Sequence, residues 1–128
     1  MPSTVVHAGF ALLLAAALLR DHYDRRALAA LLVVVVVPEV DSFLGPIMPG
    51  AHRTVGHNLV FPAVGALLLY YDTRIRDGSL VRDRLSDRWV AIAWVAVFVH
   101  VFAHIALDWT HLDGVNLLWP LRDEFLAL

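Results

Sequence analysis

Residues 5–19 read VVHAGFALLLAAALL, and this stretch decides the fold class of the 128-residue chain. Such a stretch could form a membrane-spanning helix or a buried helix of a soluble bundle. An amphipathic helix of a soluble protein carries a polar stripe along its whole length. No strongly polar residue follows His7 in this stretch, which favours the membrane helix. Further apolar runs cover residues 27–37, 55–71 and 89–107. A membrane-spanning helix needs roughly 20 residues, and open strands cannot satisfy their backbone in lipid. We therefore predict an all-α polytopic membrane protein.

The composition supports the same class. Hydrophobic residues make up 59% of the chain and charged residues 17%, with a mean hydropathy of +0.67, which excludes both an ordinary soluble domain and a disordered one. The absence of cysteine excludes disulfides and thiolate catalysis. A net charge of −2 gives no reason to expect a nucleic-acid partner. The length predicts one membrane domain over residues 1–128.

The second apolar run is too short to cross a bilayer. Its 11 residues cover about 16 Å as a helix, against about 30 Å of hydrocarbon. The sequence PEVDSFLGPIMPG follows at residues 38–50, and Pro38 cannot donate an intrahelical hydrogen bond. We therefore predict a four-helix up-down bundle with a short or broken second helix. The expected helices cover residues 4–20, 27–37, 55–71 and 89–108, with a polar loop at 72–88.

The arginines predict the orientation of the chain. Eight of them flank the first and third connections of the predicted bundle: Arg20, Arg25, Arg26, Arg74, Arg76, Arg82, Arg84 and Arg88. Only Arg53 and Arg122 fall on the opposite side. Cytoplasmic loops of membrane proteins are enriched in arginine and lysine. We therefore expect a multi-pass protein of the plasma (inner) membrane, with the second connection and both termini on the extracytoplasmic side.

Histidines and acids from four separate segments fall near this extracytoplasmic end. They are His7, Glu39, Asp41, His52, His57, His104 and Asp108, with Arg53 among them. Ionisable residues are costly inside a membrane, and they indicate a functional site unless another reason is found. A small bundle would bring the four segments together.

The last apolar run carries the most regular pattern. His100, His104, Asp108 and His111 are spaced by four, four and three residues, so they share one helix face. Imidazole and carboxylate groups one turn apart can hold a divalent metal. A simple hydrogen-bonded pair is the alternative for His104 with Asp108. For His100 alone, a bond to a neighbouring carbonyl is the simpler interpretation, and His111 stays open between ligand and surface.

The segments around Pro38 and His52 form a second group. Glu39 and Asp41 are two residues apart, which suits a loop that turns both carboxylates to one point. His52 and His57 are five apart and fit a loop residue and a first-turn residue. Either carboxylate could instead sit at the interface without a metal, and this alternative is weaker for Asp41.

Three neighbours of His57 have simpler roles. Gly56 allows the close approach of backbone or substrate. Arg53 could pair with Glu39, or it could hold an anionic group with its planar fork. Asn58, like Thr54, fits a cap at the start of a helix better than a catalytic group.

The order of these motifs resembles the YdjM-type inner-membrane metal-dependent hydrolases over nearly the whole chain. The matching motifs are His7, Pro38-Glu39-Val40-Asp41, His52-Arg53-x-x-x-His57, and His104-x-x-x-Asp108 followed by Thr110 and Gly114. The sequence departs from the family pattern at Glu39, where aspartate is usual, and at Asn58, where serine is usual. The family is distantly similar to the zinc-dependent phospholipase C and fungal single-strand nuclease group, which cleave phosphoesters. Of the further zinc ligands in that group, only His111 offers a match here.

The resemblance implies a membrane-embedded metal-dependent hydrolase that cleaves a phosphoester, such as a lipid head group, with a metal-activated water. It implies metal ligands at His7, Asp41, His52, His57, His104 and Asp108. Glu39 is the expected general base or bridging carboxylate, and Arg53 is expected to offset phosphate charge. Zinc is the expected metal, with manganese or iron as alternatives.

Two other functions compete with hydrolysis. A non-catalytic metal- or haem-binding bundle could use His7 and His104 on facing helices, although haem does not need the clustered carboxylates. The polar cluster could also serve only to hold helices together. Interhelical hydrogen bonds in membranes average under roughly 1 kcal/mol, so six or more ionisable groups are a costly way to obtain that cohesion.

Overall fold

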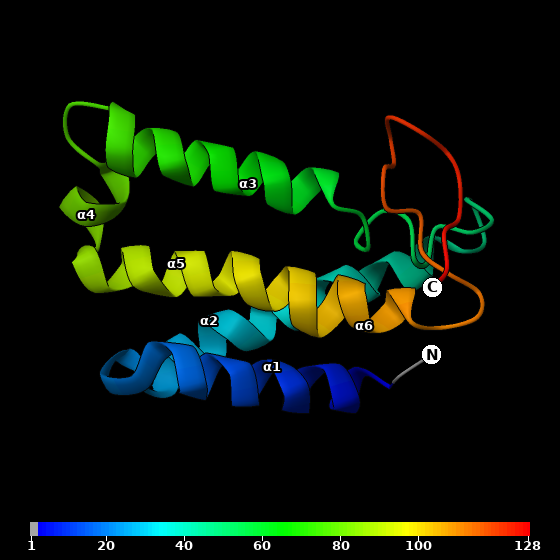
Figure 1. Cartoon of the computed structure of the whole chain (residues 1–128), viewed down its shortest axis with the longest axis horizontal. Helices are drawn as coiled ribbons and strands as arrows, with labels where there is room; N and C mark the ends of the chain where they lie inside the picture. Colours follow the sequence, from blue (N-terminus) through cyan, green and yellow to red (C-terminus); the bar gives the residue numbers. More distant parts are fainter. Residues whose placement is uncertain (1–2) are drawn as a thin grey trace.

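The structure is a computed structural model that describes residues 3–128, and Figure 1 shows its helices in chain order. The α-helices are α1 (Thr4–Leu19), α2 (Arg25–Val36), α3 (Val60–Tyr70), α4 (Leu80–Arg84), α5 (Asp87–Val99) and α6 (Ala106–Trp109). The 3-10 segments are η1 (Arg20–His22) and η2 (Val37–Leu44), and the π-helical segments are η3 (Tyr71–Ile75) and η4 (His100–Ile105). Within the described residues, β-structure is limited to one bridge between Val115 and Leu126. The prediction of an all-helical protein is confirmed.

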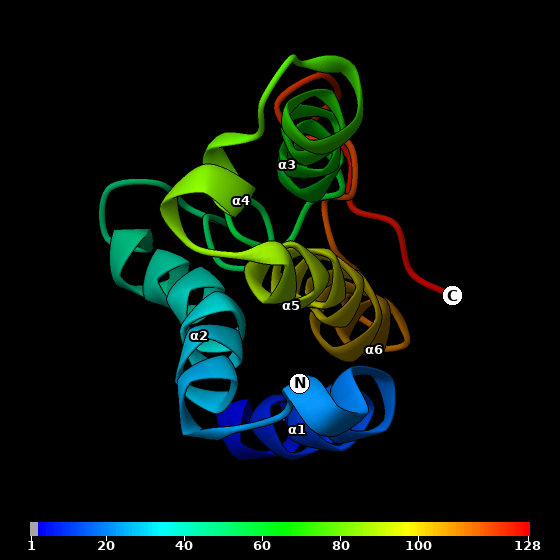
Figure 2. The same ribbon diagram turned by 90° about the vertical axis from the view of Figure 1, so that its left-hand side faces the viewer.

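Three of the long helices share one hydrophobic core. The core side chains come from α1, α2, α5 and η4: Ala11, Ala15, Leu19, Ala27, Leu31, Val35, Ile92, Val99 and Ala103. Small residues allow helix backbones to approach closely, which is how helices cohere in lipid. α3 contributes no residue to this core and lies on the far side of α5 from α1 (Figure 2). The four-helix bundle is therefore not confirmed, because among the long helices of residues 3–128 the extensive packing of α3 is against α5.

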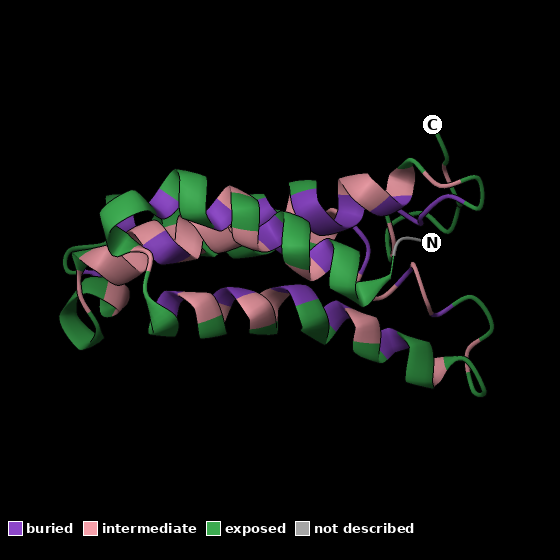
Figure 3. Cartoon of the chain, turned by 90° about the horizontal axis from the view of Figure 1, so that it is seen from below, coloured by how far each residue is buried: buried purple, intermediate pink, exposed green. Residues whose placement is uncertain are grey.

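Within the part of the chain that the structure describes, three helical stretches are long and apolar enough to cross a membrane, namely Thr4–His22, Arg25–Leu44 and Asp87–Trp109. Only 22% to 28% of each apolar window is buried inside the protein. Figure 3 shows exposed positions recurring along every long helix. The exposed side chains include large apolar ones such as Val5, Leu13 and Val33. Such a surface would be a liability in water and is the expected one where lipid is the solvent.

The second span is longer than its apolar run predicts. The α-helix ends at Val36, and η2 continues the helical path to Leu44. Pro38 lies at the start of η2, where its missing N–H is tolerated because the first residues of a helix lack an intrahelical acceptor anyway. The predicted break near Pro38 is confirmed, because the α-helix gives way there to a 3-10 helix. The α-helix ends one residue before the predicted end at 37, and the sequence pattern does not predict the continuation as η2.

The third helix begins later than predicted, at Val60 instead of residue 55. Asn58 causes this shift, because its amide donates to the carbonyls of Thr54 and Val55 while its oxygen accepts from the N–H of Phe61. These bonds close the preceding turn and cap α3, as expected for Asn58. The helix then runs to Ile75 through η3, and the predicted polar loop at 72–88 contains α4. At about 24 Å, the helix over residues 60–75 is shorter than the three spans above.

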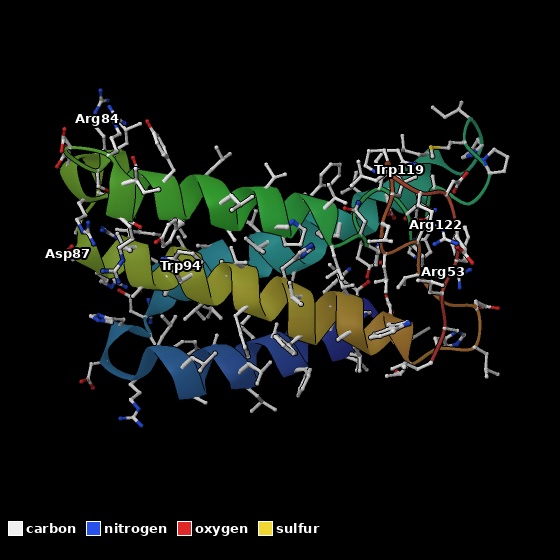
Figure 4. All side chains as sticks on the ribbon, turned by 45° about the horizontal axis from the view of Figure 1, so that its top comes forward. Arg53, Arg84, Asp87, Trp94, Trp119 and Arg122 are labelled. Atoms are coloured by element: carbon white, nitrogen blue, oxygen red, sulfur yellow. The ribbon has the colours of Figure 1, made fainter. Side chains whose placement is uncertain are left out.

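The connections lie at opposite ends of the molecule. The turn between α1 and α2 and the segment carrying α4 occupy one end, whereas residues 45–59 and the C-terminal segment occupy the other (Figure 1). Arg84 and Asp87 lie at the first end, and Arg53, Trp119 and Arg122 lie at the second (Figure 4). This placement agrees with the predicted up-and-down path of the chain and with its two arginine-rich connections on one side.

Candidate metal centre

Side chains from four segments meet at the end of the core that lies opposite the arginine-rich connections. His7 comes from α1, Glu39 from η2, His57 from the loop before α3, and His104 with Asp108 from η4 and α6. The side chains of His7, His57, His104 and Asp108 are fully buried, and that of Glu39 is 18% exposed. The structure therefore brings together five of the residues that the sequence marks as a site.

The donor atoms of the cluster lie close to one another. His7 Nε2 is 3.1 Å from Asp108 Oδ1, and His57 Nε2 is 3.2 Å from Asp108 Oδ2. Glu39 Oε1 is 3.6 Å from His7 Nδ1 and 3.8 Å from His104 Nε2. The two Nε2 atoms of His57 and His104 are 2.8 Å apart, although such a pair can share only one proton. The arrangement concentrates lone pairs in a small volume.

Most of these buried atoms lack a hydrogen-bond partner among residues 3–128. The unpaired atoms are both ring nitrogens of His7, Glu39 Oε1, His104 Nδ1 and both oxygens of Asp108. The short contacts of His7 and His57 with Asp108 thus have the distance of hydrogen bonds without their alignment. Buried polar groups are normally paired, and an unpaired cluster calls for an explanation such as a bound ion.

The spacing of the donor atoms fits a metal ion. Zinc–nitrogen bonds of about 2.0–2.1 Å in a tetrahedron place neighbouring ligand atoms about 3.3 Å apart. The separations in the cluster, from 2.8 to 3.8 Å, lie on both sides of that value. Three groups of residues could hold an ion with donors within 4.8 Å of one another: His7, Glu39 and His104; Glu39, His52 and His57; and His57, His104 and Asp108. Imidazole and carboxylate are a donor set that zinc accepts.

Asp41 lies beside the cluster and orients its histidines. One carboxylate oxygen accepts from His57 Nδ1 at 3.0 Å and from the backbone N–H of Gly56 at 3.0 Å. The other oxygen accepts from His52 Nδ1 at 2.9 Å. With Nδ1 bound in this way, His57 directs Nε2 towards Asp108 and His104. Carboxylates commonly fix metal-binding histidines through the ring nitrogen that does not contact the ion.

The carboxylates make this region favourable for positive charge. Burial lowers the pKa of His57, which lies in the loop between two membrane spans, but the neighbouring carboxylates of Asp108 and Asp41 outweigh burial and raise this pKa to about 9. Two negative groups within hydrogen-bonding distance of one imidazole favour its charged form.

Gly56 allows the His57 loop to lie directly on η2. A Cβ atom at this position would be 2.6 Å from Pro38 Cα and 2.7 Å from its carbonyl oxygen. The contact places the backbone N–H of Gly56 on Asp41. The expectation that Gly56 permits a close backbone approach is confirmed, and its partner is Pro38 near the start of η2.

We expect Gly56→Ala to destabilise the protein by about 1–3 kcal/mol, because the added methyl group overlaps backbone that cannot move freely. Gly65→Ala in α3 is the matched control, since a Cβ there meets nothing within 4 Å. Thermal unfolding in detergent, followed by circular dichroism, measures both variants. Equal melting temperatures for Gly56→Ala and wild type would contradict the packing described.

The remaining predicted residues lie around the cluster or away from it. Arg53 has a φ of 68°, a conformation uncommon for non-glycine residues, and its guanidinium contacts Asp113 and the carbonyl of Gly114 at 3.3 Å each. Within residues 3–128 its guanidinium forms no ion pair with Glu39 or with another member of the cluster. His111 lies in the following turn, 3.4 Å from Asp113.

His100 is one turn before His104 and stacks on its ring, with centroids 5.7 Å apart and an interplanar angle of 12°. Its imidazole hydrogen-bonds to the backbone of Val34, as the simpler interpretation of the sequence expects. His100 therefore packs beside the cluster and belongs to none of the three metal-binding groups found in residues 3–128.

Sequence reasoning missed the part played by the C-terminal segment. The buried Asn116 donates from its backbone to the carbonyl of Arg53 and from its amide to Asp123 at 2.6 Å. The N–H of Leu59 donates to the carbonyl of Leu117 at 2.8 Å. These bonds fasten the loop that carries His52 and His57. A polar residue in an apolar stretch such as VNLLW is the one signal that could have indicated this role.

The fold and the cluster together define a class, a helical multi-pass membrane protein with a buried histidine–carboxylate centre near one end of its core. The chain belongs to the YdjM inner membrane protein family, whose family model matches residues 1–128. No curated protein and no solved structure matches the chain. The family resemblance expected from the four motifs is confirmed, and the protein is a multi-pass protein of the inner membrane.

Proposed function

We propose that this protein is a membrane-embedded metal-dependent hydrolase that cleaves a phosphoester. The observation that carries the proposal is the group of unpaired buried donors on His7, Glu39, His104 and Asp108. Burying polar atoms without hydrogen bonds costs free energy, and a divalent cation bound among them would offset this cost. A bound zinc ion would supply a Lewis acid for phosphate oxygens and a water of lowered pKa.

We assign the ligands from the contacts. His7, His57, His104 and Asp108 are fully buried, and their donor atoms converge. His52 completes a second group with Glu39 and His57, which could hold a further ion. Asp41, which the family pattern marks as a ligand, is assigned the role of orienting His57 and His52, since its oxygens already accept three hydrogen bonds.

Glu39 is suited to move the proton. It is the most exposed member of the cluster, and its Oε1 atom lacks a hydrogen-bond partner within residues 3–128. In hydrolysis, a water oxygen bonds to phosphorus and the ester P–O bond breaks. Glu39 accepts a proton from the attacking water and returns it to the leaving oxygen, which departs as an alcohol. Arg53 stands outside the cluster, so its proposed help with phosphate charge requires it to leave Asp113.

The position of the cluster supports a lipid substrate on the extracytoplasmic side. The cluster lies at the end of the helices away from the arginine-rich connections, which the distribution of arginine places in the cytoplasm. Its donors belong mainly to segments that could span the membrane, so a substrate within the bilayer can reach them more easily than one in bulk water. We therefore favour a phospholipid-like ester.

Haem binding is less consistent with the geometry. The rings of His7 and His104 have centroids 4.5 Å apart and are tilted by 34°, and His57 lies equally close to His104. Direct contact of these rings leaves no space between them for a macrocycle. The visible absorption spectrum of the purified protein tests this alternative, and a Soret band would support it.

Elemental analysis of the purified full-length protein tests the proposal first. We expect about one equivalent of a divalent transition metal per chain, as the compact donor set would bind. Phosphoester hydrolysis is then assayed with phosphatidic acid, phosphatidylglycerol and a water-soluble aryl phosphate, after metal removal and after zinc or manganese is restored. A metal-free protein that unfolds at the same temperature with or without added zinc would support a purely structural cluster instead.

Asp41→Asn should weaken zinc binding by about 10–100-fold, the usual effect of removing a group that orients a ligand. Asparagine offers one acceptor oxygen, whereas Asp41 uses two to hold His52, His57 and Gly56. Competition with a chromogenic chelator measures the dissociation constant. Complete loss of binding would instead make Asp41 a direct ligand, and unchanged binding would remove it from the site.

A further inference from the structure

An apolar cavity of about 670 Å³ lies between α2, the start of α3 and α5. It exists because α3 packs against α5 without joining the core of α1, α2 and α5, and Figure 2 shows α2 and α3 on different sides of α5. Its walls include Val34 of α2, Phe61 and Pro62 of α3, and Val97 of α5. The volume lies within the range of pockets that bind small organic ligands.

The cavity ends at the wall of the metal centre. η2 has three residues per turn, so Pro38, Asp41 and Leu44 share one face, and all three line the cavity. Asp41 and Gly56 form its polar end, and the hydrogen bonds of Asp41 hold His57 in the cluster. One carboxylate thus borders both the apolar space and the histidines.

The cavity opens towards the surroundings of the helices. Val33, Val37 and Val40 on its rim are 55% to 59% exposed, and they belong to the span Arg25–Leu44. Where this span crosses a membrane, the solvent beside the rim consists of hydrocarbon chains. Asp41 and His100 are the only ionisable side chains in the described lining. A charged or strongly polar molecule would therefore find few partners in this cavity.

We infer that this cavity holds one alkyl chain of a membrane phosphoester, so that the polar group of the lipid is placed beside Asp41 at the metal centre. The inference rests on the proposed hydrolysis for its choice of a phosphoester, and it specifies the substrate as one with a long hydrocarbon tail. A hydrocarbon tail matches the apolar lining, whereas a soluble phosphate has no group that fills it. A transmembrane helix of a second copy is the competing occupant, and the experiment below distinguishes it.

Photolabelling tests the cavity without using hydrolysis. The full-length protein is placed in phosphatidylcholine nanodiscs that contain phosphatidylglycerol with a diazirine in one acyl chain. After illumination, mass spectrometry locates the labelled residues. We expect labels to concentrate at Val34, Pro62 and Val97, relative to Val5 and Leu13 on the exposed face of α1. Uniform labelling of all exposed apolar positions would overturn the inference.

Two valines of α2 provide matched variants. Val34→Trp fills the cavity, whereas Val36→Trp adds the same bulk at an exposed position that does not line it. Because the indole occupies the space of the chain, labelling of Pro62 and Val97 should fall to the level seen at Val5 and Leu13. Val36→Trp should leave the labelling as in wild type. The labelling pattern of the wild-type protein tests the inference by itself. The inference can therefore still be refuted if Val34→Trp does not fold.

The outcomes separate this inference from the proposed function. Concentrated labelling without hydrolysis of any phosphoester would uphold the cavity and contradict the enzyme. Hydrolysis of aryl phosphate and phosphatidylglycerol at rates that Val34→Trp does not change would uphold the enzyme and contradict the cavity. Val34→Cys introduces the sole cysteine of the chain, and disulfide-linked dimers formed at this position would identify a second copy as the occupant and overturn the inference.

Discussion

Asp108→Ala is expected to abolish stable metal binding, with metal content falling from about one equivalent per chain to a background level. Both carboxylate oxygens are buried and unpaired within residues 3–128, at 3.1 Å from His7 and 3.2 Å from His57. Removing them takes away a ligand and also the negative charge that offsets the cation. Elemental analysis after size-exclusion chromatography measures the change.

The matched control is Asp87→Ala at the opposite end of the molecule, where the side chain is 87% exposed (Figure 4). This variant should keep the metal content of wild type. Circular dichroism must show that Asp108→Ala remains helical, because an unfolded protein would lose metal for another reason. Wild-type metal content in folded Asp108→Ala would exclude Asp108 as a ligand.

Glu39→Gln should lower kcat for phosphoester hydrolysis by about 10²–10⁴-fold, the usual contribution of a general base. The amide keeps the shape of the side chain and cannot accept the proton of the attacking water. The metal content should stay near that of wild type, because four buried donors from His7, His57, His104 and Asp108 remain. Steady-state kinetics with the best lipid of the substrate panel measures kcat.

Glu124→Gln is the matched control, since Glu124 is the only other glutamate of the chain and pairs with Arg122 away from the cluster. It should retain wild-type kcat. Parallel loss of metal and activity in Glu39→Gln would show that Glu39 acts as a ligand. Full activity with full metal content would require a different base.

The broad architecture follows from features that a sequence displays directly. The apolar run after His7 predicts α1 to within a residue of its observed end at Leu19. The position of Pro38 predicts the change of helix type after Val36. The distribution of arginine predicts which connections share an end. These are local or compositional properties, so they do not require knowledge of tertiary contacts.

The finer features depend on contacts between distant residues. The late start of α3 depends on the bonds made by Asn58 and on the bond from Leu59 to Leu117, which lies 58 residues after Leu59. The π-helical turn over His100–Ile105 alters the angular spacing of His100, His104 and Asp108, and no motif indicates it. The even spacing therefore placed His100 on the same face as the ligands, whereas the structure turns it towards Val34.

In the candidate site too, the sequence indicates which residues take part, whereas their roles depend on tertiary contacts. The histidines and acids could be chosen by their cost in a membrane and by the family motifs, and the structure brings most of them together. Their individual roles could not be assigned, because Asp41 and Asp108 are equivalent as letters in a sequence. Only their partners distinguish them: Asp41 accepts from two Nδ1 atoms and a backbone N–H, whereas Asp108 is left with unpaired oxygens.

The convergence of four segments has a consequence for biosynthesis. His104 and Asp108 are made 97 and 101 residues after His7. A partly synthesised chain inserted in the bilayer therefore has an incomplete set of donors and cannot retain an ion tightly. Under the proposed metal binding, loading of the cation would follow insertion of the span Asp87–Trp109, and the timing of maturation would then depend on the supply of metal.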